Sequence, residues 1–378
     1  MCLTASRKDR KRKLKDKENE VSPIKPRAPR DNGAPDYEPY LHPSMQRNYG
    51  RWTGHRSIRP GVFVHQADSG DSLFTVRAGS PRLMSARLLR RICDVADKFC
   101  QGRLRFTSRN NVEFQVETEA EVQPLIDEIE KVLGFPVGGT GRSVHNIIHT
   151  QGWLHCNLPN TDASGVVKSI MDMLYEEFTH ENFPQRVKIS TSCCTINCGG
   201  QTDIAINLQH HHPPVIDHEM VGRCELPKVI AICPVMAIRP DRKDVHDTVE
   251  VIEEKCMYCG ACHAQCPAIE IRDGDTDTLS IWVGGKSSHT RGGPAFMKLA
   301  AIGLPNNPPR WPEVGDALKR LLNAYKDGAR EFERVGEWID RIGWKNFFDL
   351  TGFEFTKYHI DNYRWARTTF NTSSHVRL

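Results

Sequence analysis

The sequence predicts an α+β protein with two mixed units, a small cysteine-rich insert and a helical C-terminal region. The first observation is that short segments rich in β-branched and aromatic residues alternate with longer segments of helical periodicity, as in α/β sandwiches. The second is that apolar residues recur at helical spacing from Pro312 to about residue 350. The third is that seven of the 13 cysteines crowd into residues 193–198 and 256–266.

The first unit follows the order strand, strand, helix, strand, helix, with one further strand possible at its end. Between residues 85 and 100, for example, Leu88, Ile92 and Val95 lie at the spacing of one helix face. That order is the one expected of a ferredoxin-like α/β sandwich. The expected strands are 61–66, 73–79 and 103–116, with the further strand possible at 144–150, and the expected helices are 85–100 and 121–135.

A second unit begins with a helical pattern at 164–178, which is followed by a strand pattern at 186–191. Strand patterns at 248–254 and 279–285 flank the cysteine-rich insert. We therefore divide the chain into an N-terminal arm (1–45), a first half (46–155), a second unit (156–225 with 280–310), the insert (226–279) and the helical C-terminal region (311–378).

The composition predicts a soluble globular protein, because 26% of the 378 residues are charged and 39% are hydrophobic. No run of about 18 apolar residues is present, so no membrane span is expected. The N-terminus also lacks the apolar stretch of a secretory signal. Tightly spaced cysteines suit metal centres better than a disulfide network, and disulfides are scarce in reducing cytosol. We therefore expect a cytoplasmic metalloprotein.

The net charge of +4 is concentrated at the N-terminus. Residues 1–30 contain 11 Lys or Arg against four Asp or Glu, a balance of +7, which leaves −3 for the remainder. With almost no apolar content at its start, this basic arm is expected to be disordered or extended. It could bind an acidic partner or remain a solvated tail, and no nucleic-acid function is inferred from it.

The insert contains the stretch EKCMYCGACHAQCPAIEI, in which four cysteines are spaced C-x2-C-x2-C-x3-C and the last precedes proline. This is the iron–sulfur run of bacterial ferredoxins, where the first three cysteines hold one cluster and the fourth belongs to another. Cys256, Cys259 and Cys262 are therefore expected to share a [4Fe–4S] cluster. Cys233, which precedes proline and a short apolar strand in AICPVMAI, is expected to complete it.

Cys266 faces the position where a two-cluster ferredoxin holds its second cluster. Only Cys224 lies nearby to serve such a site, so we expect one cluster in the insert, with Cys266 an ordinary buried thiol. A zinc site is the alternative for C-x2-C spacing. Zinc sites rarely use three cysteines at successive x2 spacing together with Cys-Pro, which favours iron–sulfur.

A second group of cysteines occurs in KISTSCCTINCGG, where Cys193, Cys194 and Cys198 follow a strand and precede two glycines. Cys156, at the end of the strand-like segment TQGWLHC, is the best distant partner. Four thiolates make a second [4Fe–4S] site. The alternative is that the adjacent cysteines are simply buried small residues.

This second group resembles the sirohaem–[4Fe–4S] site of sulfite and nitrite reductases, with its C-x3-C before glycine, its upstream cysteine and its basic strand. Over residues 50–370 the chain resembles the beta subunits of dissimilatory sulfite reductases. The resemblance implies sulfite/nitrite reductase-type α/β sandwich domains with an inserted ferredoxin domain. The segments that carry it are TQGWLHC, TDASGVVKSIMD, EKCMYCGACHAQCPA, NNPPRWP and RVGEWIDRIGW.

The resemblance also implies a role. Electrons from a donor protein are expected to enter at the ferredoxin-type cluster and pass to a haem-linked cluster and sirohaem, where sulfite undergoes six-electron reduction toward sulfide. The expected partners are an alpha subunit, in an alpha2beta2 heterotetramer, and a small thiol-bearing sulfur-carrier protein.

Individual residues are assigned by the same resemblance. Cys198 matches the cysteine whose sulfur bridges the cluster to the haem iron, and Cys156, Cys193 and Cys194 match its companions. Sirohaem carboxylates and the sulfite dianion both suit the forked donors of arginine. The expected cofactor-binding arginines are Arg105 and Arg109, and the expected catalytic residues are Arg77, His145, Arg186 and Lys188. Arg186 and Lys188 alternate along one strand, which directs both side chains to one face.

Two other functions remain open. The same complex could run in reverse and oxidise reduced sulfur, because the sequence does not fix the direction. The chain could also be an electron-transfer subunit, or one whose own haem pocket is structural. An assimilatory sulfite or nitrite reductase is a related possibility. Those enzymes lack the inserted ferredoxin motif, which this chain contains as CMYCGACHAQCP. The run of His210, His211 and His212 is expected to be a loop at a strand end rather than a metal tract.

Overall fold

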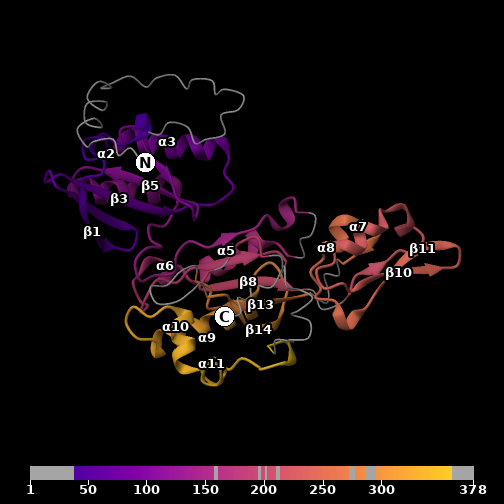
Figure 1. The fold of residues 1–378 in the computed structure, drawn as a ribbon. Coiled ribbons are helices and arrows are strands. Elements are labelled where there is room, and N and C mark those ends of the chain that lie inside the picture. The colour runs from indigo at the N-terminus through magenta and orange to yellow at the C-terminus, as the bar shows by residue number, and fades with distance from the viewer. Residues whose placement is uncertain are drawn as a thin grey trace, which may run out of the picture. The chain divides into compact units, whose positions relative to one another are not determined.

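The computed structural model describes residues 38–156, 161–194, 197–200, 202–209, 213–271, 277–286 and 295–359. The chain forms two compact units, Met1–Gly138 and Gly139–Leu378, which are described separately. Figure 1 shows the first unit in indigo and purple and the second from magenta to yellow. No described helix is long and apolar enough to cross a membrane. The basic residues 1–37 and His210–His212 lie outside the described residues.

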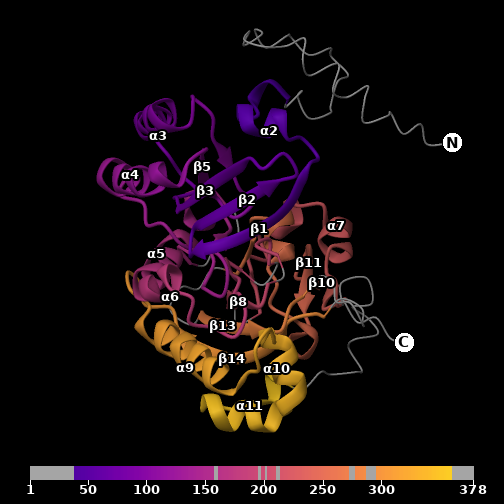
Figure 2. The same cartoon turned by 90° about the vertical axis from the view of Figure 1, so that its left-hand side faces the viewer.

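The first unit is a five-stranded antiparallel sheet with helices on one face. Its strand order is β1-β2-β3-β5-β4. Ile92 and Val95 from α3 and Leu125 and Ile126 from α4 pack on the sheet around the fully buried Phe114, and both helices lie on the same side of it (Figure 2). The elements are η1 (Glu38–Tyr40), α2 (Pro43–Arg47), β1 (Trp52–Arg59), β2 (Val62–Ala67), β3 (Ser72–Gly79), α3 (Ala86–Phe99), β4 (Arg105–Phe106), β5 (Asn111–Val116), η2 (Glu119–Glu121), α4 (Val122–Glu128) and η3 (Ile129–Leu133).

The second unit is built on a mixed five-stranded sheet of order β14-β13-β8-β7-β6. Strands β6, β7 and β8 are parallel, whereas β13 and β14 join them antiparallel. The helices pack into one large apolar core with the sheet, which includes Ile206, Leu318 and Trp338. The elements are β6 (Ile148–His149), η4 (Gly152–Leu154), α5 (Ala163–Met173), α6 (Tyr175–Thr179), β7 (Ile189–Ser192), β8 (Ile204–Gln209), β13 (Thr278–Val283), β14 (Lys298–Pro305), α9 (Pro312–Gly328), α10 (Val335–Ile342), α11 (Trp344–Thr351) and η7 (Lys357–His359).

The insert lies between β8 and β13 and has its own small core around Val221, Val229 and Ile269. Two short antiparallel pairs frame it, β10 with β11 and β9 with β12. Its elements are β9 (Val215–Ile216), η5 (Val221–Arg223), α7 (Leu226–Ala231), β10 (Ile238–Lys243), β11 (His246–Val251), η6 (Glu253–Lys255), α8 (Ala261–Gln265) and β12 (Ile269–Glu270).

The structure places one predicted strand in a different sheet. The sequence allowed a further strand at 144–150 within the first half, which we predicted to cover 46–155. Val144 instead bridges to Val187, and Ile148 pairs with Ser190, so this segment is part of the second sheet. Along the chain, the boundary between the two compact units consequently lies between Gly138 and Gly139. Strand β1 was not predicted, because its side chains are mostly exposed and do not alternate between apolar and polar.

Candidate functional site

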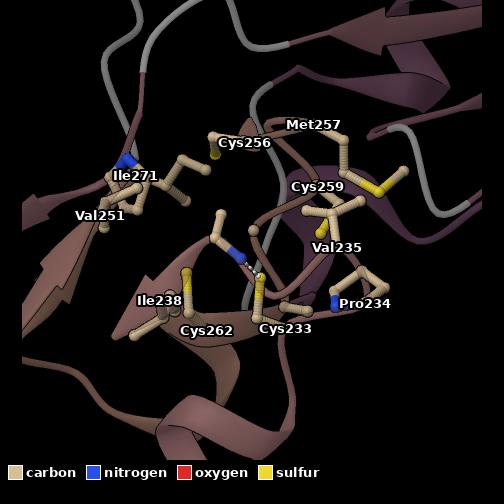
Figure 3. Close-up of a pocket in the computed structure, with 14 residues that line it drawn as sticks. Cys233, Pro234, Val235, Ile238, Val251, Cys256, Met257, Cys259, Cys262 and Ile271 are labelled. Atoms are coloured by element: carbon tan, nitrogen blue, oxygen red, sulfur yellow. Dashed lines mark hydrogen bonds between the residues drawn. The ribbon is translucent and has the colours of Figure 1, made fainter. Parts of the chain in front are cut away.

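The four cysteines expected to hold the ferredoxin-type cluster line a single cavity in the insert. Cys233 follows α7, Cys256 and Cys259 lie in the loop before α8, and Cys262 is on α8 itself. All four line one partly open pocket, and their side chains surround one space in Figure 3. Across the described residues no three His, Cys, Asp or Glu side chains converge closely enough to hold a single metal ion. The four thiols line cavity walls instead of meeting at one point.

The loop carrying these cysteines turns through two left-handed residues, Tyr258 with φ 55° and Gly260 with φ 73°. Gly260 adopts this conformation at the start of α8, where its missing Cβ avoids strain. On the other side of the cavity, the backbone N–H of Ala237 donates to the Cys233 sulfur at 3.1 Å. Hydrogen bonds to ligand sulfur are among the features that set the potential of an iron–sulfur cluster.

The surroundings of Cys256, Cys259 and Cys262 favour the protonated thiol. Burial raises the pKa of Cys256 to about 11 and that of Cys262 to about 12, and it also raises the pKa of Cys259. Metal ligation requires thiolates, so binding must release protons from these groups. The remaining walls are largely apolar and include Pro234, Val235, Ile238, Val251 and Ile271. Four cysteines in an apolar cavity fit an iron–sulfur cluster.

Cys266 does not behave as expected. It is fully buried, but it forms a disulfide with Cys224, with the two Cα atoms 5.9 Å apart. The expectation of an ordinary thiol was wrong because β12, just after Cys266, pairs with β9 through Ile269 and Ile216. That pairing brings the chain around Cys224 next to Cys266. Because both sulfurs are joined in the disulfide, neither Cys224 nor Cys266 is a free thiol for a second cluster.

Three of the four cysteines in the second group come together near the end of β7. Cys193, Cys194 and Cys156 form a small cluster with Ala163 at the start of α5. The pKa of Cys193 is lowered to about 5, chiefly by a hydrogen bond from the Cys194 thiol, with further contributions from Thr150 and Cys156. A thiolate is therefore favoured at Cys193, as a metal ligand requires.

Gly152 allows Cys156 to approach this group. Its φ is +56°, and a Cβ here would lie 2.8 Å from the backbone nitrogen of Ala163. The Cys156 N–H donates to the Gly152 carbonyl at 3.2 Å. This hydrogen bond closes a turn from Gly152 to Cys156. A larger residue at position 152 would push this turn away from α5.

Cys198 is not part of the buried group, because its side chain is exposed. The chain returns to β7 immediately after it: the Gly199 N–H donates to the Ser192 hydroxyl at 3.1 Å. A Cβ on Gly199 would lie 2.9 Å from that oxygen, which accounts for glycine there. Residues 195 and 196, within this loop, lie outside the described residues.

The basic pair Arg186 and Lys188 lies just before β7, not on it, since the strand begins at Ile189. Alternation nevertheless holds, because Val187 and Ile189 are fully buried while Arg186 is exposed and Lys188 half-buried. Both basic side chains are therefore directed away from the core. His145 neighbours them, as its N–H donates to the Val187 carbonyl at 2.9 Å.

The segment with Lys188 is fixed by a buried carboxylate that the sequence did not reveal. The Lys188 N–H donates to Asp203 Oδ2 at 2.9 Å. The same carboxylate receives a forked pair of hydrogen bonds from Arg334, from Nε to Oδ1 and from Nη2 to Oδ2, each at 2.7 Å. Arg334 directly precedes α10, so the helical C-terminal region helps to hold this segment.

In the first unit, Arg77 on β3 and Arg105 on β4 both bind Glu113 on β5. The Nε atoms of the two arginines lie 2.7 and 2.6 Å from the two carboxylate oxygens. Arg109 lies half-buried in the turn between β4 and β5. Sequence reasoning selected the arginines but missed Glu113, although a glutamate between Val112 and Phe114 in a buried strand is a signal that could have found it.

Family models match both units. Residues 140–357 match the model described as "Nitrite and sulphite reductase 4Fe-4S domain", and residues 65–132 match the "Nitrite/Sulfite reductase ferredoxin-like half domain". The beta subunit of the dissimilatory-type sulfite reductase of Nitratidesulfovibrio vulgaris is 45% identical over 369 residues, which cover 92% of this chain and 97% of the relative. The corresponding subunit of Archaeoglobus fulgidus is 46% identical over 343 residues, covering 88% and 93%. The chain belongs to this beta-subunit family.

The predicted family, enzyme class and fold are thereby confirmed. This beta subunit is an oxidoreductase of the sulfite reductase family, which implies iron–sulfur and sirohaem-type cofactors. The crystal structure titled dissimilatory sulfite reductase I has the same fold, with a TM-score of 0.74 at 19% identity, covering 84% of this chain and 81% of that one. The roles assigned to single residues stay predictions.

Proposed function

We propose that this beta subunit catalyses the six-electron reduction of sulfite toward sulfide, or toward carrier-bound sulfur, at a sirohaem coupled to a [4Fe–4S] cluster. The observation that supports this most is the presence of two separate cysteine groups in one chain, one in the insert and one beside β7. A pure electron-transfer subunit has use for only the first. When bound, the sirohaem and its neighbouring cluster supply the iron site for sulfite and the electrons for its reduction.

Each cysteine group has its own task in this proposal. Cys233, Cys256, Cys259 and Cys262 hold the cluster that receives electrons from a donor protein. Cys156, Cys193, Cys194 and Cys198 would hold the second cluster, and Cys198 is also assigned to binding the sirohaem. The exposure of Cys198, in contrast to the burial of Cys193 and Cys194, is consistent with a sulfur that serves a group outside the protein core.

The basic residues supply charge and protons. Arg186 and Lys188 shortly precede Cys193, Cys194 and Cys198 in the chain and point away from the core. We assign them, with Arg77 and His145, to binding the sulfite dianion and to stabilising negative charge on oxygen as S–O bonds break. Lys188 donates a proton to the leaving oxygen. Arg105 and Arg109 are assigned to the carboxylates of sirohaem, for which guanidinium groups are well suited.

The assembly proposed is an alpha2beta2 heterotetramer in the cytoplasm that works with a thiol-bearing sulfur carrier. A dissimilatory-type sulfite reductase alpha subunit, from Allochromatium vinosum, is 23% identical to this chain over 300 residues, which supports a common ancestor for the two subunits. Operation in reverse is the second candidate. Assaying the purified complex from sulfite with a reduced dye, and from sulfide with an oxidised acceptor, distinguishes the two directions.

The direct test of the catalytic proposal is the Lys188→Met variant in the complex with the native partner. A positioned proton donor contributes roughly 100-fold or more to rate, so kcat for sulfite-dependent oxidation of reduced viologen should fall by about that factor while cofactor content is retained. Lys168→Met is the control, because Lys168 pairs with Asp172 on the exposed surface of α5. A Lys188→Met variant with an unchanged kcat contradicts the proposal.

A further inference from the structure

One feature of the first unit is not used by the cysteine chemistry: a buried carboxylate that joins two arginines. Glu113 is 0% exposed, whereas the side chains of Arg77 and Arg105 are 21% and 62% exposed. Arg77 approaches oxygen Oε1 with Nε at 2.7 Å and with Nη2 at 2.5 Å. Arg105 approaches Oε2 with Nε at 2.6 Å and also with Nη2. Both oxygens of the carboxylate are therefore engaged by guanidinium groups.

The strand register produces this arrangement. Arg77 and Glu113 are directly opposite in the β3–β5 ladder, and Arg105 and Glu113 are directly opposite in the β4–β5 ladder. Residues paired in this way project from the same face of an antiparallel sheet. Val76, Val112 and Phe114 project from the other face into the core under α3 and α4. Strands β3 and β5 are seen next to each other in Figure 1.

A third contact restrains Arg77 from another direction. Its guanidinium lies over the ring of Phe63 on β2, with Cζ 5.4 Å from the ring centroid. Stacking on an aromatic ring and the contacts of two nitrogens with one carboxylate oxygen together restrain the guanidinium plane. Each guanidinium has five N–H donors and uses two atoms, Nε and Nη2, on Glu113. Among the residues that the structure describes, the remaining donors of both arginines have no other acceptor, which leaves them for a ligand.

The charge of the group also indicates an anionic ligand. Two guanidinium groups and one carboxylate leave a net charge of +1, and the more exposed member, Arg105, carries part of it toward the outside. Burying a carboxylate costs desolvation free energy, which is offset only if its cationic partners stay charged and paired with it. A carboxylate positioned between them holds the two cations close together, where unpaired they would repel each other.

We propose that Glu113 is a positioning residue that holds Arg77 and Arg105 as one forked clamp for the anionic oxygens of a ligand. The inference rests on the proposed function, in which Arg77 is assigned to sulfite and Arg105 to a sirohaem carboxylate. A shared clamp directs both arginines to one of these two ligands. The chemistry recognised is the same in both cases, a planar or pyramidal group of anionic oxygens. Sulfite and a sirohaem carboxylate are distinguished by whether the KM for sulfite or the sirohaem content changes when the clamp is disrupted.

The test is Glu113→Gln in the complex of this chain with its native partner. The amide keeps the size of the side chain but replaces one acceptor oxygen by a donor, so one arginine is released. If the clamp holds sulfite, the KM for sulfite rises by about tenfold, the effect of losing one charge-assisted hydrogen bond, with kcat and sirohaem content close to wild type. If it holds a sirohaem carboxylate, sirohaem per chain falls while cluster iron is unchanged.

Three further variants distinguish the clamp from a simple folding effect. Arg105→Gln, on a two-residue edge strand, leaves the Arg77–Glu113 pair in place and should reproduce the pattern of Glu113→Gln. The double variant should be no worse than the stronger single one, because parts of one clamp do not act additively. Glu117→Gln is the matched control, since Glu117 makes a partly exposed pair with Arg47 at 3.0 Å.

Two outcomes overturn the inference. One is a Glu113→Gln or Arg105→Gln complex with the KM, kcat and sirohaem content of the Glu117→Gln control. The other is a parallel loss of sirohaem, cluster iron and thermal stability in both variants, which assigns Glu113 a purely structural role. Neither outcome resembles failure of the proposed function, in which the wild-type complex itself holds no sirohaem and reduces no sulfite.

Discussion

Replacing Arg334 by methionine tests how strongly the C-terminal region holds the segment that carries Lys188. Arg334 and Asp203 form a forked pair, and their side chains are only 12% and 1% exposed. Without Arg334 the Asp203 carboxylate keeps the Lys188 N–H at 2.9 Å but loses its compensating charge. Removing one partner of a buried pair costs about 3–5 kcal/mol, because the other charge stays buried and unpaired.

The expected size of the effect can be converted to a melting temperature. For a unit of roughly 150–250 residues, 1 kcal/mol corresponds to about 2–4 °C, so Arg334→Met should lower the Tm of the holo complex by about 10 °C. The assay is differential scanning calorimetry of the complex at fixed protein concentration. Adding Asp203→Asn to Arg334→Met should recover part of the loss, since the uncompensated charge is then gone.

The control for this prediction is Lys345→Met in α11, whose pair with Asp349 is 89% and 64% exposed. Exposed pairs contribute about 0–1 kcal/mol, so its Tm should change by no more than about 4 °C. If Arg334→Met lowers the Tm no more than Lys345→Met does, the Asp203–Arg334 pair does not stabilise this segment as proposed. The reasoning is equally refuted if Asp203→Asn makes the Arg334 variant worse.

Three other predictions follow from the cysteine groups. Cys262→Ser should remove the ferredoxin-type cluster, seen as a loss of about four irons per chain by metal analysis, and should abolish turnover with a protein donor. Replacing Cys224 and Cys266 by serine should destabilise the insert by up to about 4 kcal/mol, because the disulfide closes a loop of 42 positions; protease sensitivity of the insert under non-reducing conditions measures this. Gly199→Ala should lower iron in the second cluster only, because its Cβ would lie 2.9 Å from the Ser192 hydroxyl.

Matched controls exist for these changes. Cys93→Ser alters an exposed cysteine on α3 and should leave the iron content unchanged. Gly54→Ala adds a Cβ with nothing within 4 Å and should leave both clusters intact. Iron loss in either control, or full iron in Cys262→Ser, contradicts the assignment of ligands. Equal protease sensitivity with and without the disulfide contradicts its stabilising role.

The parts of this protein that the sequence predicted are those in which the chemistry is local. Cys256, Cys259 and Cys262 lie within seven consecutive residues, and the structure places them with Cys233 around one cavity. Helix α3 also forms where predicted, between Ser85 as N-cap and Cys100 as C-cap. Spacing along one loop or one helix face is set by backbone geometry that the sequence alone determines.

Features that depend on distant pairing could not be predicted. The Cys224–Cys266 disulfide requires β9 to pair with β12, and the Asp203–Arg334 pair joins residues 131 positions apart. Strand 144–150 was assigned to the wrong sheet for the same reason. Glu113 presents a local signal, a charge in a buried strand, but its partners are known only from the register of three strands.

The measurement that tests the central claim most directly is the content of iron, acid-labile sulfide and extractable sirohaem per chain, with the visible spectrum, in the complex purified with its native partner. The account predicts about eight cluster irons per chain, four for each group of cysteines, together with sirohaem and its red-region absorption band. About four irons and no sirohaem would contradict it, and would leave this chain an electron-transfer subunit without a reaction centre of its own.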